Sequence, residues 1–336
     1  MNKKWLFFTW LFCVPAILFS AEKMFSLPDI LKPRIMAVDE NNLYVSDHEQ
    51  VFIYSLNTSK LVKKFGRLGS GPGEFPFAPM MKIYPDKILL HFANKFAYFN
   101  KSGELIYEKQ VPFLFMDVGA VDDNFVFSRF DFAGVSGPED LSTISVYDQT
   151  LKKVNTLSEK IVSFKNKGTK KQRDLINPIR KFQCYSNKIY LADGEKGFHF
   201  DVYDSNGKSS GNIQREYKKI KISEAYKTQK FEEYKNRPAV KKRWHTLSKL
   251  FDYAFPEYFP AIQDFLIADN KIYVRTYLSE KGKDEYLILD LDGKLIKKVF
   301  LPEAHHLFYA VKNNTFYYMI ENEEDEEWEL HAQKIE

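Results

Sequence analysis

Alternation of apolar and polar residues dominates the chain, and helical spacing of apolar residues is almost absent before residue 223. The recurring unit is an apolar pair, a tight turn rich in Asp or Asn, and a second apolar run. Such alternation predicts half-buried strands, and Asp and Asn accept tight hairpin geometry. Six copies of the unit occur, at residues 37–45, 83–90, 120–126, 184–190, 267–273 and 310–316.

A second hairpin follows in each of the first five units. Its turn lies near residues 57–59, 101–103, 148–150, 205–207 and 292–293. Each unit therefore contains four predicted strands, and the first two units are spaced as four-stranded blades of ~40–50 residues would be. The pattern predicts an all-β fold, a six-bladed β-propeller over residues 22–336.

The sixth unit has only three predicted strands before the chain ends. Residues 24–31 precede the first inner strand and have no partner within their own unit. An unpaired edge strand leaves backbone groups unsatisfied and promotes association. We therefore expect the N-terminal segment to complete the last blade.

Residues 223–252 interrupt the repeat and predict a helical insertion between blades 4 and 5. Ser223 can cap the first helix, and Trp244, Leu247 and Phe251 fall at helical spacing for docking. The opposite face is basic. A solvated face is the simpler interpretation of these cations, and an anionic partner is the alternative. The basic face carries Lys241, Lys242, Arg243, His245 and Lys249.

The first 21 residues follow a different pattern from the rest of the chain. A basic start at residues 2–4 precedes an apolar run from Trp5 to Phe19, and small residues follow at Ser20 and Ala21. This layout predicts a signal peptide over residues 1–21, or an uncleaved N-terminal anchor as the alternative. We expect an exported protein, periplasmic or extracellular, that contacts the membrane only through this segment if it is retained.

Composition narrows the function classes only slightly. Basic residues number 49 and acidic residues 45, so the net charge of +4 is too small to predict nucleic-acid binding. Removal of the first 21 residues would leave Cys184 as the one cysteine, which excludes an intramolecular disulfide.

Four stretches carry a family resemblance. They are Leu43–Asp47, Gly69–Phe75, Phe255–Pro260 and Leu289–Leu295. These residues resemble the bacterial exported six-bladed β-propeller family of the NHL-repeat type, from about Phe25 to the C-terminus. The resemblance implies the fold and says little about activity, because a fold hosts many functions. Related propellers include lyases and lactonases with a metal at the central channel, so a metal-dependent lyase or lactonase-like hydrolase is the alternative function.

The sequence has no metal-ligand spacing, nucleophile elbow or phosphate loop, so no catalytic residue, metal ligand or cofactor is predicted. A Ca or Zn ion bound in the channel remains an open alternative. Its ligands would then come from distant blades, for example His91 and His306. The inner strands are expected to begin with a mixed set that does not resemble a metal cage. This set is Arg34, Lys82, Asp117, Arg180, Gln263 and His306.

Loop lengths predict which face of the ring binds a ligand. In four-stranded meanders the first and third turns lie on one face, whereas the second turns and the links between blades lie on the other. The long connections here all belong to the second class, and binding residues concentrate on such loops. We therefore expect an exported binding or scaffold protein rather than an enzyme, for a polar small molecule, a glycan or a peptide or protein. The alternative is that the charges on this face pair with one another. The candidate binding residues are Arg34, His91, Arg129, Asp131, Arg180, Asp264, Arg275 and His306.

Overall fold

The computed structural model describes residues 22–131, 140–162, 166–167 and 170–335. The predicted signal peptide or anchor at residues 1–21 lies outside the described residues. Within the described ranges, no helix is long and apolar enough to cross a membrane.

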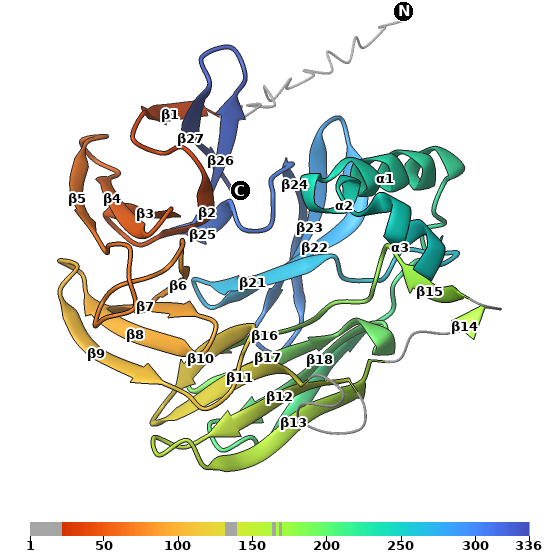
Figure 1. Ribbon diagram of the computed structural model, residues 1–336, viewed down its shortest axis with the longest axis horizontal. Coiled ribbons are helices and arrows are strands. Elements are labelled where there is room, and N and C mark those ends of the chain that lie inside the picture. The colour runs from red at the N-terminus through yellow and green to blue at the C-terminus, as the bar shows by residue number, and fades with distance from the viewer. Residues whose placement is uncertain (1–21, 132–139, 163–165, 168–169, 336) are drawn as a thin grey trace, which may run out of the picture.

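Six four-stranded antiparallel sheets surround a central axis as the blades of a propeller (Figure 1). Blade 1 contains β2 (Pro33–Val38), β3 (Asn42–Asp47), β4 (Gln50–Ser55) and β5 (Leu61–Phe65). Blade 2 contains β6 (Met80–Ile83), β7 (Lys87–Phe92), β8 (Lys95–Asn100) and β9 (Leu105–Gln110). Blade 3 contains β10 (Asp117–Val121), β11 (Asn124–Asp131), β12 (Leu141–Tyr147) and β13 (Lys153–Ile161).

The second half of the ring repeats this order. Blade 4 contains β16 (Arg180–Tyr185), β17 (Lys188–Asp193), β18 (Phe198–Asp204) and β19 (Ser209–Arg215), with a short 3-10 helix at Gly194–Lys196. Blade 5 contains β21 (Asp264–Ala268), β22 (Lys271–Glu280), β23 (Lys283–Asp290) and β24 (Leu295–Pro302). Blade 6 contains β25 (Tyr309–Lys312), β26 (Thr315–Asn322), β27 (Glu327–Lys334) and β1 (Glu22–Leu27).

The ring closes through the N-terminal strand. β1 pairs antiparallel with β27, and Phe25 lies opposite Leu330 in this register. Phe25 and Leu27 are buried in one cluster with Met36 and Met319, so the strand joins the core between blades 6 and 1. The expectation that the N-terminal segment completes the last blade is confirmed.

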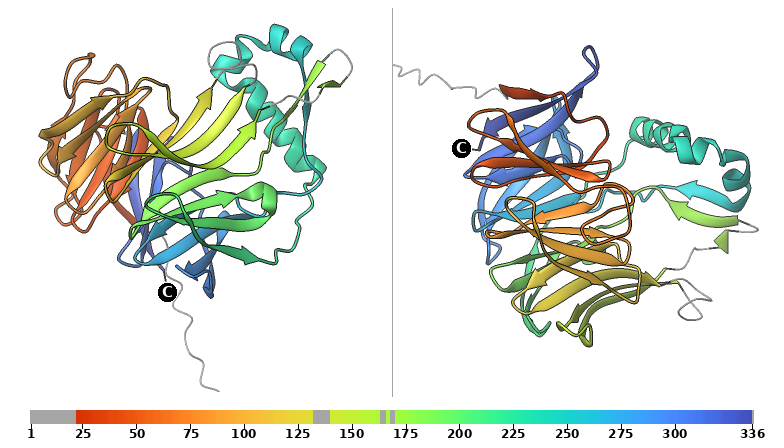
Figure 2. Two further views of the ribbon diagram at one scale, coloured as in Figure 1. Left: turned by 90° about the horizontal axis from the view of Figure 1, so that it is seen from below. Right: turned by 60° about the vertical axis from the view of Figure 1, so that its left-hand side comes forward.

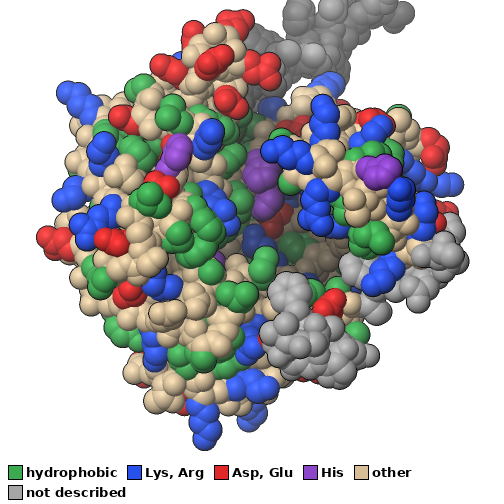
Figure 3. Space-filling view, in the orientation of Figure 1, with side chains coloured by type: hydrophobic (Ala, Val, Ile, Leu, Met, Phe, Trp, Pro, Cys, Tyr) green, Lys and Arg blue, Asp and Glu red, His purple; other side chains and the backbone are tan. Residues whose placement is uncertain are grey.

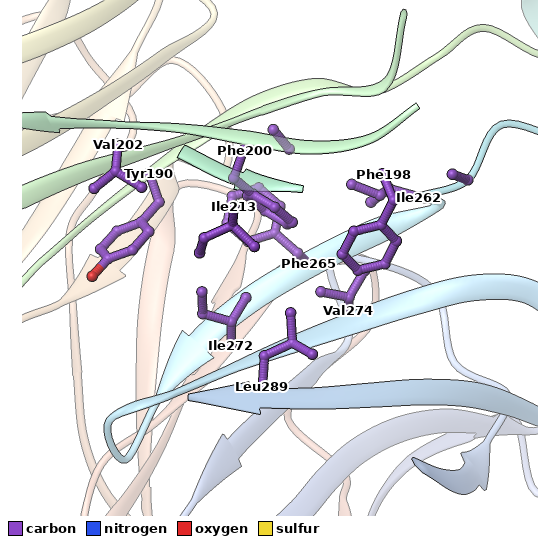
Figure 4. Close-up of a cluster of buried hydrophobic side chains, with 12 residues drawn as sticks. Tyr190, Phe198, Phe200, Val202, Ile213, Ile262, Phe265, Ile272, Val274 and Leu289 are labelled. Carbon is purple, nitrogen blue, oxygen red and sulfur yellow. The ribbon is translucent and has the colours of Figure 1, made fainter. Parts of the chain in front are cut away.

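Apolar and aromatic side chains fill the space between neighbouring blades. Between blades 4 and 5, Phe200 and Phe265 meet edge to face with ring centroids 5.0 Å apart. Ile213 from β19 and Ile272 and Leu289 from blade 5 surround them (Figure 4). Truncating a buried Phe at such a site typically costs about 3–5 kcal/mol, so these layers contribute strongly to the stability of the ring.

Glycine permits a close backbone approach at the start of the long link from blade 1 to blade 2, which the sequence marks by four glycines between Phe65 and Phe75. Gly66 has φ +90°, and a Cβ at this position would lie 2.6 Å from the carbonyl oxygen of Glu49. Only glycine adopts this conformation without strain in so close an approach. The link then buries Phe75 before β6 begins.

Three helices lie between β19 and β21 in the sequence: α1 (Glu224–Asn236), α2 (Pro238–Lys241) and α3 (Trp244–Leu250). As expected, the Ser223 side chain accepts a hydrogen bond from the Tyr226 amide and caps α1. The structure differs from the expectation at the end of the segment, because Phe251 begins a strand. That strand, β20 (Phe251–Ala254), pairs in parallel with β15 (Lys170–Asp174), which pairs with β14 (Asn166–Lys167).

We call these helices and the β14–β15–β20 sheet the excursion, which stands away from one face of the ring (Figure 2). Trp244 packs within the excursion itself, stacked on Tyr253 and edge-on to Phe231. One contact with the ring runs through Tyr226, whose ring meets Phe259 at 4.9 Å between centroids, and Phe259 in turn stacks on Tyr277 of β22. Aromatic packing therefore gives the excursion a small core of its own.

The two faces of the ring differ in the length of their connections. The first and third turns of blade 1 span only residues 39–41 and 56–60. On the other face the links between blades span residues 66–79, 162–179 and 216–263, and the last of these contains the helices. We call this second face the long-loop face.

Candidate functional site

Strand register places most of the candidate residues at the long-loop end of the channel. Asp264, the first residue of β21, lies opposite Arg275 of β22. Arg180 takes the same place in blade 4, opposite Asp193, and His91 lies opposite Met80 in blade 2. Figure 3 shows this face hollowed near its centre, with histidine, basic and acidic side chains around the hollow.

A buried network of polar side chains lies between blades 4, 5 and 6. The Asp264 carboxylate accepts hydrogen bonds from Lys181 Nζ at 2.7 Å and from the Tyr309 hydroxyl at 2.8 Å. Burial, and then the charge of Asp264, raise the pKa of Tyr309 well above its usual value. Asp264 is therefore already satisfied by two donors of the chain itself.

Arg275 is buried next to this network. Its guanidinium forms an ion pair with Asp284 and donates to the carbonyl oxygen of Ala304 at 2.6 Å. Burial alone would lower the pKa of Arg275, but Tyr286 and Asp284 outweigh burial and raise it. With 6% of its surface exposed, Arg275 supports the fold and is not open to a ligand.

His306 lies in the link before β25, beside His305, and both side chains are exposed. The two imidazole centroids are 4.2 Å apart. Partial burial lowers the pKa of His306, and Lys181 and Arg275 act in the same direction, whereas Asp264 opposes them. His306 therefore lies within electrostatic reach of the Asp264 network.

A second cluster joins blades 2 and 3. Lys82 Nζ lies 2.8 Å from Asp117 Oδ1, and His91 Nε2 lies 3.4 Å from the same oxygen. Burial would raise the pKa of Asp117, but Lys82 and His91 hold it well below its usual range. Burial lowers the pKa of His91, and Asp117 only partly opposes this.

Two further candidate arginines have partners in their own or the neighbouring blade. Arg129 forms an ion pair of 2.6 Å with Asp131, and its guanidinium carbon lies 4.1 Å from the Phe113 ring centre. Arg180 donates from Nε to the Ser158 hydroxyl and from Nη1 to the carbonyl oxygen of Ser142, both at 2.9 Å. Burial lowers the pKa of Arg180.

Arg34 is in a different situation, because its side chain is exposed. Its Nε donates to the Met80 sulfur at 3.4 Å, and its guanidinium carbon lies 5.7 Å from the centre of the Phe77 ring. The nearby Asp47 is occupied, since it accepts from the amides of Leu31 and Lys32 at 2.6 and 3.1 Å. No ion pair forms at Arg34 among the residues that the structure describes.

An open hollow of about 530 Å³ adjoins Arg34 on the long-loop face. Its wall comes from the link before β2, the turn between β3 and β4, and the link before β6. The charged and aromatic residues in this wall are Lys32, Arg34, His48, Glu49 and Phe77. His48 Nδ1 lies 2.6 Å from Asp47 Oδ1, so Lys32 and Arg34 are the two fixed cations of this wall and Glu49 is its one carboxylate.

The structure brings only some of the candidates together. Asp264, Arg275 and His306 share one cluster, and Arg129 lies with Asp131. Sequence reasoning did not identify Lys181 and Tyr309 as partners of Asp264, because they lie 83 and 45 residues away and no local pattern connects them. In the described ranges, no three His, Cys, Asp or Glu side chains gather as metal ligands would.

Comparisons with known proteins agree with this architecture. The model of the DUF5128 family, described as "6-bladed beta-propeller", matches residues 29–237. A comparison with curated proteins finds no match.

Two solved structures show a weak likeness to the chain. BamB from Moraxella catarrhalis is 10% identical with a TM-score of 0.34, over 89% of this chain and 71% of that chain. A protein of unknown function from Bacteroides caccae is 11% identical with a TM-score of 0.38, over 83% and 82%. Neither likeness carries an argument about function. The family match spans more than half of the sequence, and the chain therefore belongs to this family of six-bladed β-propellers.

Proposed function

We propose that the chain is an exported binding protein that takes a polar ligand with an anionic group in the hollow beside Arg34. One observation carries the proposal. The other basic side chains at the candidate clusters have carboxylate or internal polar partners, whereas Arg34 is exposed beside an open cavity. An exposed arginine without a carboxylate partner is a ready site for an anion.

The wall of the hollow indicates the ligand chemistry. A guanidinium binds carboxylate or phosphate through two parallel hydrogen bonds, which a lysine ammonium cannot do. Lys32 adds positive charge, and the exposed ring of Phe77 adds an apolar surface. A carboxylate-bearing small molecule, such as an acidic sugar or the end of a glycan that carries one, fits this combination of charge and ring.

Export is part of the same proposal. The basic start and apolar run of residues 1–21 support secretion to the periplasm or the cell exterior, or anchoring by this segment. We also propose that the repeats of the propeller are of the NHL type. The alternative of a metal-dependent lyase or lactonase stays a prediction. Metal analysis of the purified protein, followed by activity assays with and without the metal, would test it.

Calorimetric titration with matched probes tests the ligand class. We expect tri-galacturonate to bind and its methyl ester to bind at least 10-fold more weakly, because esterification removes the charge. Arg34→Gln should weaken binding of the free acid at least 10-fold. Arg67→Gln is the matched control, since Arg67 lies on the same face but is paired with Glu74, and it should stay within twofold. Equal binding of acid and ester, or no effect of Arg34→Gln, would contradict the proposal.

A further inference from the structure

The excursion carries a basic surface that its own acids do not neutralise. On α1, Lys227, Lys230 and Lys235 pair with glutamates of the same helix. The segment that follows has no acidic residue from Arg237 to Leu250, and no ion pair forms there within the described ranges. We call this the α2–α3 basic surface. Its exposed cations are Arg237, Lys241, Lys242, Arg243 and Lys249.

An acidic tip occupies the turn between β26 and β27 in blade 6. Four consecutive acidic residues, Glu323 to Glu326, are exposed there. Asn322 holds the turn, since its Oδ1 accepts from the Glu324 amide at 3.0 Å and its Nδ2 donates to Asp325 at 3.2 Å. The tip therefore presents concentrated negative charge on a defined hairpin.

The basic surface and the acidic tip lie on the same side of the molecule. The β26–β27 turn is the second turn of its blade, and the excursion lies within links between blades, so both belong to the long-loop face. Figure 3 shows acidic side chains gathered over the β26–β27 turn and basic side chains gathered over the helices, at separate places on this face. The excursion projects from this side of the ring (Figure 2).

We propose that two copies of this chain associate face to face, with the acidic tip of each copy on the α2–α3 basic surface of the other. A two-fold dimer needs complementary patches at two places on one surface, because each contact is made twice with the roles exchanged. This chain has such a pair of patches. Neither is part of the hollow at Arg34, so the proposal is independent of the proposed ligand.

Electrostatic association of this kind has a defined salt dependence. The charges are exposed, so their attraction is screened over about 10 Å at 0.1 M salt and over about 3 Å at 1 M. Complementary patches steer two molecules together and exclude wrong orientations, in which like charges would meet. We expect a dimer at low ionic strength that dissociates when salt is added.

Sedimentation velocity of the full chain without residues 1–21 tests the proposal. At 100 μM protein we expect a dimer in 50 mM NaCl and a monomer in 500 mM NaCl. Lys241→Glu with Lys242→Glu should give a monomer at low salt, and so should Glu324→Lys with Glu326→Lys. An equimolar mixture of these two variants should restore the dimer, because the unaltered tip of one variant then meets the unaltered basic surface of the other, and the substituted positions carry opposite charges at the second contact.

A matched control distinguishes an effect of the α2–α3 basic surface from an effect of the net charge of the protein. Lys63→Glu with Lys64→Glu changes the charge equally on the exposed outer strand of blade 1 and should leave the dimer intact. A monomeric wild type at 50 mM NaCl would overturn the proposal, and would point to a different acidic partner for the basic surface. A dimer that persists in both charge-reversal variants, or a mixture that stays monomeric, would also overturn it.

Discussion

Blades 1 and 5 differ in the environment of the charged residues at the long-loop end of their inner hairpins. In blade 5, Asp264 and Arg275 face each other at the start of the inner hairpin, and both are buried with partners from other segments. In blade 1 the acid at this place, Asp47, binds backbone amides of the preceding link, and Arg34 projects into an open hollow. A charged residue at one position of a repeat can therefore stabilise the ring in one blade and remain available to a ligand in another.

The largest expected effect on stability comes from removing the buried ion pair of blade 5. Arg275→Met should lower the free energy of unfolding by about 3–5 kcal/mol, because Asp284 would stay buried without its counter-ion. Denaturant unfolding followed by fluorescence measures this loss. Arg34→Met is the matched variant at the exposed position. A loss below 1 kcal/mol for Arg275→Met would show that Asp284 finds another partner.

A smaller effect is expected from the hydroxyl that holds Asp264. Tyr309→Phe keeps the ring and removes one hydrogen bond to a buried carboxylate, which is worth about 1.5–3 kcal/mol. Tyr317→Phe, on the neighbouring strand β26, has no such hydrogen bond among the described contacts and should change stability by less than about 0.5 kcal/mol. Equal effects of the two variants would contradict a role for the Asp264 network in stability.

The cluster between blades 2 and 3 predicts a pH dependence. The pKa of His91 is lowered in the folded protein, so the unfolded chain, with a His pKa near 6.5, takes up the proton first. Stability is therefore complete above about pH 7 and falls as the pH drops below about 6.5, by about 1.4 kcal/mol for each unit by which the pKa is lowered. His91→Gln should flatten this decline between pH 7 and 5. An unchanged slope in chemical unfolding would contradict it.

The smallest effect on stability should come from Arg34. Arg34→Gln should change the free energy of unfolding by less than about 0.5 kcal/mol, because the side chain is exposed and forms no ion pair with the described residues. Thermal and denaturant unfolding would measure this change. A loss above 1 kcal/mol would place Arg34 with Arg275 among the residues that hold the ring, and would remove the contrast between the two blades.

Sequence reasoning predicted the repeat better than the site. The turns at Asn41, Asp86 and Asn270 mark hairpins whose strands are close in sequence, and the missing fourth strand of blade 6 predicted the partner of β1. The helical segment ended earlier than expected, because residues 251–254 pair with residues 171–174, far away in the chain. Such a pairing has no signal in a local pattern.

By itself the sequence determined that the chain is an all-β ring of six four-stranded units, with its long connections on one face. The physical reason is that alternation, tight turns and the number of strands are local properties, each set within about ten residues. Only the tertiary structure decided which charges are neutralised. Lys181 and Tyr309 reach Asp264 because neighbouring blades bring their inner strands together. In blade 1, by contrast, Asp47 binds two backbone amides and His48, and Arg34 remains exposed.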